Sequence, residues 1–142
     1  MLFKNILVPY DGSSHSKHSF KVALDMSKKY NSKLSVVTVL DTSTGYWAHT
    51  SIWDNAISGA KTLVTREFES FESAAKKAKV SFHSKIIESH STTKAIVSYS
   101  KSKKIDLIVM GAHGKTGLDK LILGSVSNSV VHRVRCPVLI VR

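Results

Sequence analysis

A chain of 142 residues has the length of one domain, which can bury about two-thirds of its unfolded surface in a core of its own. Its 21 Lys and Arg residues outnumber its 10 acidic residues, so the formal net charge is +11 and anionic ligands are favoured. The single cysteine, Cys136, excludes an internal disulfide, and no apolar run reaches the roughly 18 to 20 residues that span a bilayer. We therefore expect one domain over residues 1–142, cytoplasmic and without a membrane partner.

The first 30 residues have the pattern of a strand, a turn and a helix. Residues 3–9 are predicted to form a buried strand, because the centre of this run is apolar without alternation. A proline ends the strand, and Asp11, Ser13 or Ser14 is expected to cap the helix that follows. Apolar positions at spacings of three and four carry this helix to about residue 30 and place Tyr30 on its apolar face.

The middle of the chain repeats this order with a longer helix. A second strand is predicted at 34–40, and the polar and aromatic stretch 41–51 is expected to be a loop that is either mobile or a lid. A helical stripe of apolar residues then runs through 54–79. The third strand, 80–88, alternates between apolar and polar residues, which indicates a position at the edge of a sheet.

The last third adds two helices and two strands. The polar residues 91–93 are expected to cap a short helix, and the apolar run 105–110 to form the fourth strand. A helix from about Ser125 precedes the fifth strand, 137–141. This strict alternation predicts an α/β fold with a five-stranded parallel sheet, right-handed crossovers and helices on both faces, as in Rossmann-like proteins.

A glycine-rich loop joins the fourth strand to the last helix. It contains Gly111, Gly114, Gly117 and Gly124, and Ser125 follows at the predicted helix start. Glycines in such a loop permit φ above zero and a close approach of the backbone to a ligand. Free N–H groups at the start of a helix favour anions, so the sequence predicts a phosphate site here. Such sites lie beyond the carboxyl ends of the strands of a parallel sheet.

Two common phosphate motifs do not fit this loop. Gly114-Lys115-Thr116 resembles the end of a Walker A motif, but that motif requires glycine at position 109, which is Val109. A dinucleotide fingerprint that starts at Gly111 requires glycine at position 113, which is His113. Both motifs are therefore excluded.

The loop instead resembles the nucleotide loop of the universal stress protein family, with the spacing Gly111-x2-Gly114-x9-Gly124-Ser125. The resemblance extends to the opening segment 5–11, to 123–127 and to the closing segment 136–141. It implies the strand order 3-2-1-4-5, the fold also described as adenine nucleotide alpha hydrolase-like, and a homodimer formed through the last strand, Pro137 to Val141. The chain is most similar to the members of the family that bind ATP.

For those members the family implies a set of nucleotide-binding positions. The loop glycines and Ser125 would surround the phosphates, Pro9 and Val39 would lie beside the adenine, and Asp11 would be close to the adenine or the ribose. Relatives often carry a side chain where this chain has Gly117, so one contact is expected to be missing. ATP would bring Mg²⁺ or Mn²⁺ held mainly by its phosphates. The implied nucleotide-binding residues are Pro9, Asp11, Val39, Met110, Gly111, Ala112, His113, Gly114, Lys115, Thr116, Gly117, Gly124, Ser125, Val126 and Ser127.

Several of these side chains have a second interpretation. Asp11 either orients a sugar, accepts from an adenine amine, holds a metal ion or caps the first helix, and Ser125 either contacts phosphate or only caps the last helix. His113 either approaches a phosphate, acts as a base or has no catalytic duty. His15 and His18 either share a metal ion or, as we expect, lie on a solvated surface.

The sequence favours nucleotide binding over catalysis. It provides a phosphate site but neither an evident base nor the paired carboxylates that hold Mg²⁺, since only Asp11, Asp41 and Asp119 lie near the loop. We therefore expect a regulatory protein of the stress response that binds ATP, with slow ATP hydrolysis as an alternative. Two different functions stay open beside it: the binding of cyclic nucleotides, and a basic interaction protein that holds nucleic acid or another anionic partner, although nucleic acid is the less favoured partner.

Overall fold

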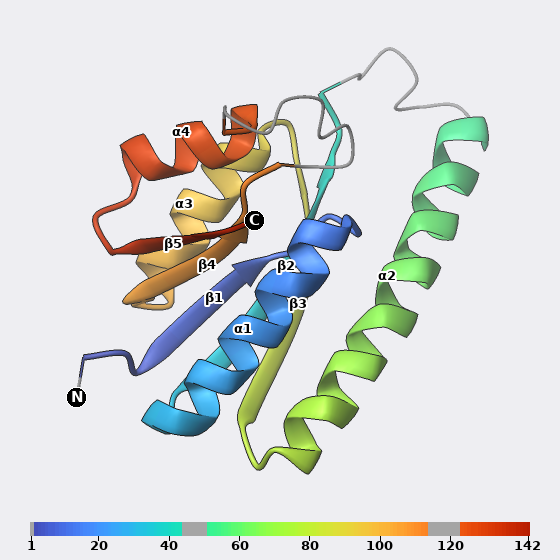
Figure 1. The fold of residues 1–142 in the computed structure, drawn as a ribbon. Helices are drawn as coiled ribbons and strands as arrows, with labels where there is room; N and C mark the ends of the chain where they lie inside the picture. The colour runs from blue at the N-terminus through green and yellow to red at the C-terminus, as the bar shows by residue number, and fades with distance from the viewer. Residues whose placement is uncertain (1, 44–50, 114–122) are drawn as a thin grey trace.

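The computed structural model describes residues 2–43, 51–113 and 123–142 (Figure 1). Strands and helices alternate through these described ranges, as the sequence predicts. Their bounds are β1 Asn5–Pro9, α1 Ser14–Tyr30, β2 Lys33–Asp41, α2 Ser51–Lys77, β3 Ser81–Ser89, α3 Thr92–Ser102, β4 Leu107–Gly111, α4 Ser125–Arg133 and β5 Val138–Val141. Among the described residues, no helix has both the length and the apolar character needed to cross a membrane.

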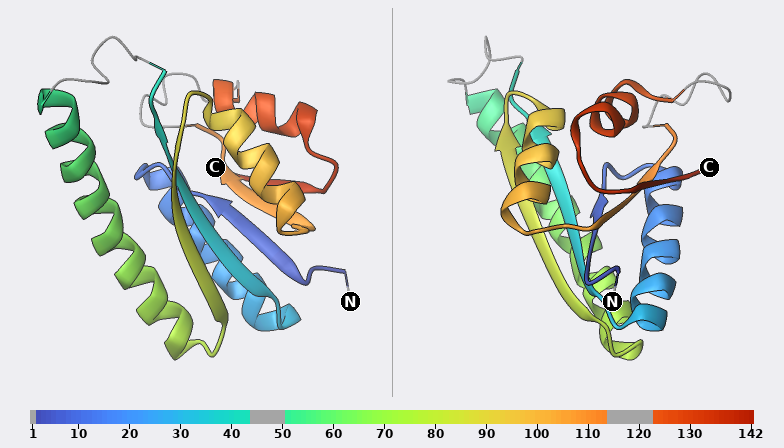
Figure 2. Two further views of the ribbon diagram at one scale, coloured as in Figure 1. Left: turned by 180° about the vertical axis from the view of Figure 1, so that it is seen from behind. Right: turned by 90° about the vertical axis from the view of Figure 1, so that its left-hand side faces the viewer.

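The five strands form one parallel sheet in the order β3-β2-β1-β4-β5, which confirms the predicted fold class and strand order. Helices α1 and α2 cover one face, while α3 and α4 cover the other, as the views in Figure 2 show. The position of β3 at an edge agrees with its alternating sequence. The strand order reverses between β1 and β4, so the connection after β1 and the connection after β4 run to opposite sides of the sheet. This leaves a space at the carboxyl ends of these two neighbouring strands.

The central strands are apolar throughout because both of their faces are covered. In β1, Ile6 and Val8 pack into the core beneath α1 and α2, whereas Leu7 between them packs into the core beneath α3 and α4. All three side chains are fully buried. Successive side chains of a strand point to opposite faces of the sheet, so this one apolar run contributes to two cores.

Several element boundaries differ from the prediction by one to three residues, and two examples are the starts of α2 and β4. Helix α2 begins at Ser51, three residues before the predicted start, and β4 begins at Leu107 instead of residue 105. The second difference has a clear cause, because the carboxylate of Asp106 accepts hydrogen bonds from the backbone N–H groups of Lys4 and Asn5, at 2.9 and 3.1 Å. This residue ties the start of β1 to the connection before β4.

Candidate functional site

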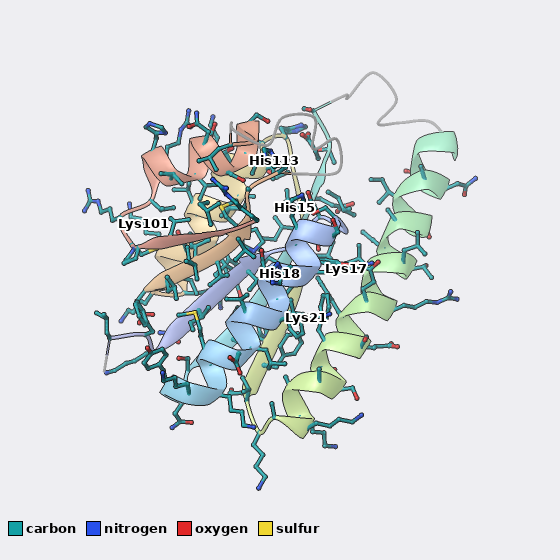
Figure 3. All side chains as sticks on the ribbon, viewed as in Figure 1. His15, Lys17, His18, Lys21, Lys101 and His113 are labelled. Carbon is teal, nitrogen blue, oxygen red and sulfur yellow. The ribbon has the colours of Figure 1, made fainter. Side chains whose placement is uncertain are left out.

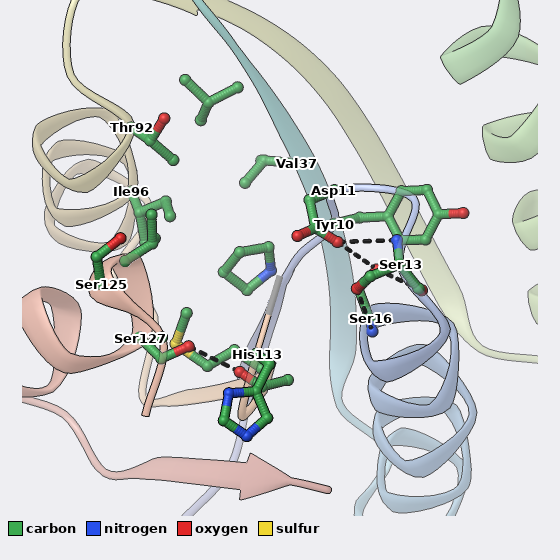
Figure 4. A pocket seen from close by; sticks show the side chains of 16 residues that line it. Tyr10, Asp11, Ser13, Ser16, Val37, Thr92, Ile96, His113, Ser125 and Ser127 are labelled. Carbon is green, nitrogen blue, oxygen red and sulfur yellow. Dashed lines mark hydrogen bonds between the residues drawn. The ribbon is translucent and has the colours of Figure 1, made fainter. Parts of the chain in front are cut away.

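A cavity of about 190 Å³ lies at the carboxyl ends of β1, β2 and β4 (Figure 4). The first turns of α1, α3 and α4 also border it, so three helix amino ends face the same space. Each amino end carries N–H groups without helical partners and the positive end of the helix dipole. The cavity therefore combines an electropositive rim with the location at which parallel sheets bind ligands.

The structure brings ten of the fifteen predicted residues together around this cavity. They are Pro9, Asp11, Val39, Met110, Gly111, His113, Gly124, Ser125, Val126 and Ser127. Ala112 is buried and is not part of the lining. Gly114, Lys115, Thr116 and Gly117 lie outside the described residues. The binding role of all fifteen stays a prediction, but the grouping shows that segments far apart in sequence share one space.

Six lining residues were not predicted. They are Tyr10, Ser13, Ser16, Val37, Thr92 and Ile96. Their positions follow from the topology, because they belong to strand ends and helix starts on the same edge of the sheet as the predicted residues. The predicted strand order therefore indicated that these residues would lie near the site.

Asp11 organises the start of α1 but does not cap it. The cap is Ser13, whose hydroxyl accepts from the backbone N–H of Ser16 at 3.1 Å. One carboxylate oxygen of Asp11, Oδ1, accepts from the N–H of Ser13 and from the hydroxyl of Ser16, both at 2.9 Å (Figure 4). These bonds hold the exposed carboxylate at the rim of the cavity.

The glycines at 111 and 124 do not adopt the left-handed conformation that we expected of the loop. Among the described residues, the glycine with positive φ is Gly12, in the turn after β1. Gly111 is needed for a different reason, because a Cβ at this position would lie 2.7 Å from the Cβ of His15. Its lack of a side chain lets α1 pack closely against the end of β4.

Hydrogen bonds fix both ends of the loop between β4 and α4. The N–H of Gly124 donates to the carbonyl of Ala112 at 2.8 Å, and the N–H of Ala112 donates to the carbonyl of Val141 at 2.9 Å. The buried hydroxyl of Ser127 donates to the carbonyl of Gly111 at 2.7 Å (Figure 4). Ser127 therefore lines the cavity but uses its hydroxyl to hold the strand end.

The amino end of α4 has no side-chain cap among the described residues. Gly124 is the N-cap residue and makes no side-chain capping bond, so the interpretation of Ser125 as the cap is wrong. Ser125 is instead the first residue of the helix, and its exposed side chain lies on the cavity side in Figure 4. A hydroxyl and the first N–H groups of the helix, which have no intrahelical partner, thus occur together at one corner of the cavity.

Two histidine rings meet beside the cavity, one of which, that of His113, is part of its lining. The rings of His15 and His113 pack edge to face with their centroids 5.5 Å apart, as Figure 3 shows at the start of α1. His15 is half-buried, so the expected solvated surface is wrong for this residue. His18 is exposed, and its Nδ1 lies 3.0 Å from the carbonyl oxygen of Arg142. Within the described ranges, no three His, Cys, Asp or Glu residues are grouped as a metal site.

The walls of the cavity are largely apolar. Pro9, Val37 and Val39 contribute from β1 and β2, and Ile96 and Val126 contribute from α3 and α4. The volume of about 190 Å³ is smaller than the roughly 300–1,000 Å³ of pockets that hold whole drug-sized ligands. The enclosed part therefore has room for one ring system, with the remainder of a larger ligand at the open rim.

Comparisons with known proteins agree on one family. The model of the universal stress protein family matches residues 2–142. A universal stress protein from Methanocaldococcus jannaschii is 34% identical over 143 aligned residues, which cover 99% of this chain and 83% of that protein. A putative universal stress protein from Staphylococcus haemolyticus is 29% identical and is covered over 86% of its length, with all of this chain aligned.

Solved structures share the fold. UspA from Lactobacillus plantarum superimposes with a TM-score of 0.86 at 24% identity, covering 100% of this chain and 99% of that one. A universal stress protein in complex with cAMP has a TM-score of 0.73 at 22% identity, covering 100% and 98% of the two chains. One from Archaeoglobus fulgidus in complex with dAMP has a TM-score of 0.71 at 19% identity, covering both chains fully. With the family model matched over nearly its whole length, this chain belongs to the universal stress protein family.

Proposed function

We propose that this chain is a single nucleotide-binding domain that takes ATP in the cavity between β1 and β4 and acts as a regulatory module in the cytoplasm. One observation carries the proposal: three helix amino ends converge on an apolar cavity at the point where the strand order reverses. The apolar interior suits a base, and the electropositive rim suits phosphates.

The base is proposed to lie against β2. Val39 is two residues past the last aligned pair of β1 and β2, which joins Pro9 to Val37. The carbonyl of Val37 points toward β1, because it accepts from the N–H of Tyr10 at 2.8 Å. Backbone groups alternate in direction along a strand, so those of Val39 also point to this side, beyond the end of β1. An N–H and a carbonyl side by side match the acceptor and the amine on the edge of adenine.

The phosphates are proposed to lie at the start of α4. Gly124 leaves the first amides of the helix without a side-chain cap, and Ser125 adds a hydroxyl. Negative charge is favoured at such a helix end by about 0.3–1 kcal/mol from the dipole alone. Gly114 and Gly117 are proposed to complete this site with further backbone N–H groups.

A metal ion is proposed to arrive with the nucleotide. The only carboxylate among the described lining residues is Asp11, and one of its oxygens already accepts two hydrogen bonds. One partly engaged carboxylate is by itself a weak site for Mg²⁺ or Mn²⁺. These ions usually bind one or two carboxylates together with phosphate oxygens, which the nucleotide would supply. We therefore favour binding over turnover, and slow hydrolysis is tested by single-turnover measurement of released phosphate.

The ligands of two structural neighbours support an adenine nucleotide. One was solved in complex with cAMP and another with dAMP, both of which are adenine monophosphates. The features shared by those ligands are the adenine base and a phosphate, which are the two groups that we place in this cavity. Competition among ATP, ADP, AMP and cAMP on the purified chain ranks the contribution of each further phosphate.

Calorimetry with a matched pair of variants tests the proposal. Val126 lines the cavity on the first turn of α4, whereas Val131 on the same helix has 39% of its surface exposed and is not part of the lining. Val126→Phe should abolish the heat of ATP binding by filling the enclosed space, and Val131→Phe should leave it unchanged. Absence of binding to the unaltered chain at millimolar ATP with Mg²⁺, or equal binding by both variants, would refute the cavity as the site.

We also propose that the chain forms a homodimer through β5. This strand lies at an edge of the sheet, and Leu139 on it has 38% of its surface exposed. An unpaired apolar edge strand promotes association unless it is covered or paired with a second copy. The native mass spectrum reports the number of subunits and any nucleotide that purifies with them. A monomer at micromolar concentration would contradict the dimer while leaving the nucleotide proposal intact.

A further inference from the structure

The positive charge of this chain is concentrated at the end of the sheet opposite the cavity. Twelve of the 21 Lys and Arg residues lie in the last two turns of the helices, in the connections that follow them or at the strand starts, and all twelve are exposed. We call this set the basic edge. Its members are Lys4, Lys28, Lys29, Lys33, Lys76, Lys77, Lys79, Lys101, Lys103, Lys104, Arg133 and Arg135.

Few acidic residues offset this charge. The same segments contain Asp25, Glu72 and Asp106, so the basic edge carries +9 of the formal +11. The carboxylate of Asp106 is already engaged by the N–H groups of Lys4 and Asn5. Cations at helix ends also complement the helix dipoles, but this role concerns the last turn and does not extend to lysines in connections and strand starts.

The segments of the basic edge are neighbours in space. The N–H of Lys33 donates to the carbonyl of Lys4 at 2.8 Å, and the side-chain Nδ2 of Asn5 donates to the carbonyl of Lys104 at 3.3 Å. Lys33 also aligns with Ser81, two residues after Lys79, at the start of β3. Figure 1 shows the N-terminus and the ends of α1 and α2 together at the lower end of the molecule. These contacts join the segments around Lys4, Lys33 and Lys104 into one surface, and Lys101, Arg133 and Arg135 lie together at the ends of α3 and α4.

This charge is too far from the cavity to serve the proposed phosphate site. The five residues of β1 alone extend about 16 Å, and the described lining contains no Lys or Arg. Exposed charges are largely screened beyond about 8 Å at physiological ionic strength. The basic edge consequently suits a second anionic partner.

Two exposed apolar side chains lie within the basic edge. Leu2 has 73% of its surface exposed, and Tyr30, predicted on the apolar face of α1, has 38% exposed. The Tyr30 ring packs edge to face against Phe3, and the Nζ of Lys29 lies 5.9 Å from its centroid. An aliphatic side chain and a tyrosine among lysines are typical of surfaces that rest in the interface of a bilayer.

We propose that the basic edge binds the surface of an anionic lipid bilayer, with Leu2 and Tyr30 at the level of the headgroups. This differs from the expectation of no membrane partner, which considered only segments that span the bilayer. Lysines outnumber arginines by ten to two on the edge. Base readout in nucleic acid most often uses the planar fork of arginine, whereas lysines bind both phosphates and an anionic leaflet as point charges. The exposed Leu2 and Tyr30 beside these lysines favour a bilayer over nucleic acid.

Vesicle sedimentation of the full chain tests this proposal. The vesicles contain phosphatidylcholine alone or with roughly one-third phosphatidylglycerol, a content that gives a negative surface potential. We expect binding only to the anionic vesicles, and weaker binding as ionic strength rises above about 0.15 M. Each lysine near such a surface contributes about fivefold, so Lys33→Gln with Lys77→Gln should weaken binding roughly 25-fold.

The control variant removes the same charge elsewhere. Lys17 and Lys94 are exposed residues in the first turns of α1 and α3, near the cavity end of the sheet. Lys17→Gln with Lys94→Gln should retain most of the vesicle binding, and thermal unfolding of both variants verifies that they fold. Equal losses in the two double variants would overturn the assignment of the surface.

Two further measurements distinguish a bilayer from other anionic partners. Leu2→Ser should weaken vesicle binding without changing any affinity for a random-sequence RNA duplex. The bilayer is rejected if Leu2→Ser has no effect on vesicle binding, or if the duplex binds at lower concentration than the anionic vesicles at the same salt. The ATP affinity of the variant Lys33→Gln with Lys77→Gln should not change, so this test is independent of the nucleotide proposal.

Discussion

Gly111 offers a test that separates a packing role from a ligand role. An alanine at this position would place its Cβ 2.7 Å from the Cβ of His15 and 3.2 Å from the backbone carbonyl carbon of His15. Neither atom is the free end of a flexible side chain, so α1 must move away from β4. Forced additions to a packed core typically destabilise a protein by about 1–3 kcal/mol. Gly111→Ala should therefore lower the unfolding free energy by this amount.

Gly59→Ala is the matched control. A Cβ at Gly59, within α2, would meet no atom within 4 Å, so this change should raise the unfolding free energy by about 0.5–1 kcal/mol through helix propensity. Urea unfolding measures both variants, and the midpoints should move in opposite directions with an unchanged slope. If Gly111→Ala is as stable as the unaltered chain, the close approach of α1 is not what selects glycine here.

Further predictions concern three side chains that are buried or partly buried. Ser127→Ala should destabilise the fold by roughly 1–2 kcal/mol, because the carbonyl of Gly111 loses its bond to the hydroxyl, and urea unfolding measures this loss. Tyr10→Phe should be stabilising by up to about 1 kcal/mol in the same assay, because the buried Tyr10 hydroxyl has no hydrogen-bond partner among the described residues. Burial, with a smaller effect of Glu67, raises the pKa of Tyr10, so the stability of the unaltered chain should fall as pH rises above about 10, while Tyr10→Phe lacks this component. Burial also raises the pKa of the Cys136 thiol, so alkylation at pH 8 should be slow in the folded protein and fast in urea.

Much of the fold could be predicted because its signals are local. Continuous apolar runs such as 6–8 indicate strands covered on both faces, and the alternation in 80–88 indicates an edge, as the sheet order confirms. Boundaries were less predictable where a distant contact sets them. The start of β4 depends on Asp106 bonding to Lys4 and Asn5, about 100 residues away, and no local pattern encodes that contact.

The candidate site was predictable in its members and less so in their roles. The family resemblance implied a site that includes Pro9, Val39 and Val126, and these three residues do line one cavity. The reason for Gly111 was missed, because the opposing Cβ of His15 comes from a helix 96 residues earlier in the chain. The same distance hid the packing of His15 against His113.

The basic edge illustrates a limit of reading charge along the sequence. Its lysines occur in short runs such as 76–79 and 101–104, each of which is ordinary at the end of a helix. Only the parallel topology brings the helix ends together, because each crossover returns the chain to the same side of the sheet. The surface follows from the fold and from no single segment.

The most direct test of the nucleotide site is an amide NMR titration of the ¹⁵N-labelled chain with ATP and Mg²⁺. The proposed site predicts that the largest shifts occur at Val39 and at residues 124–127, where we propose that the base and the phosphates lie, while the amides of Lys33 and Lys77 on the basic edge stay unmoved. Largest shifts on the basic edge, or none at any residue at millimolar ATP, would contradict it.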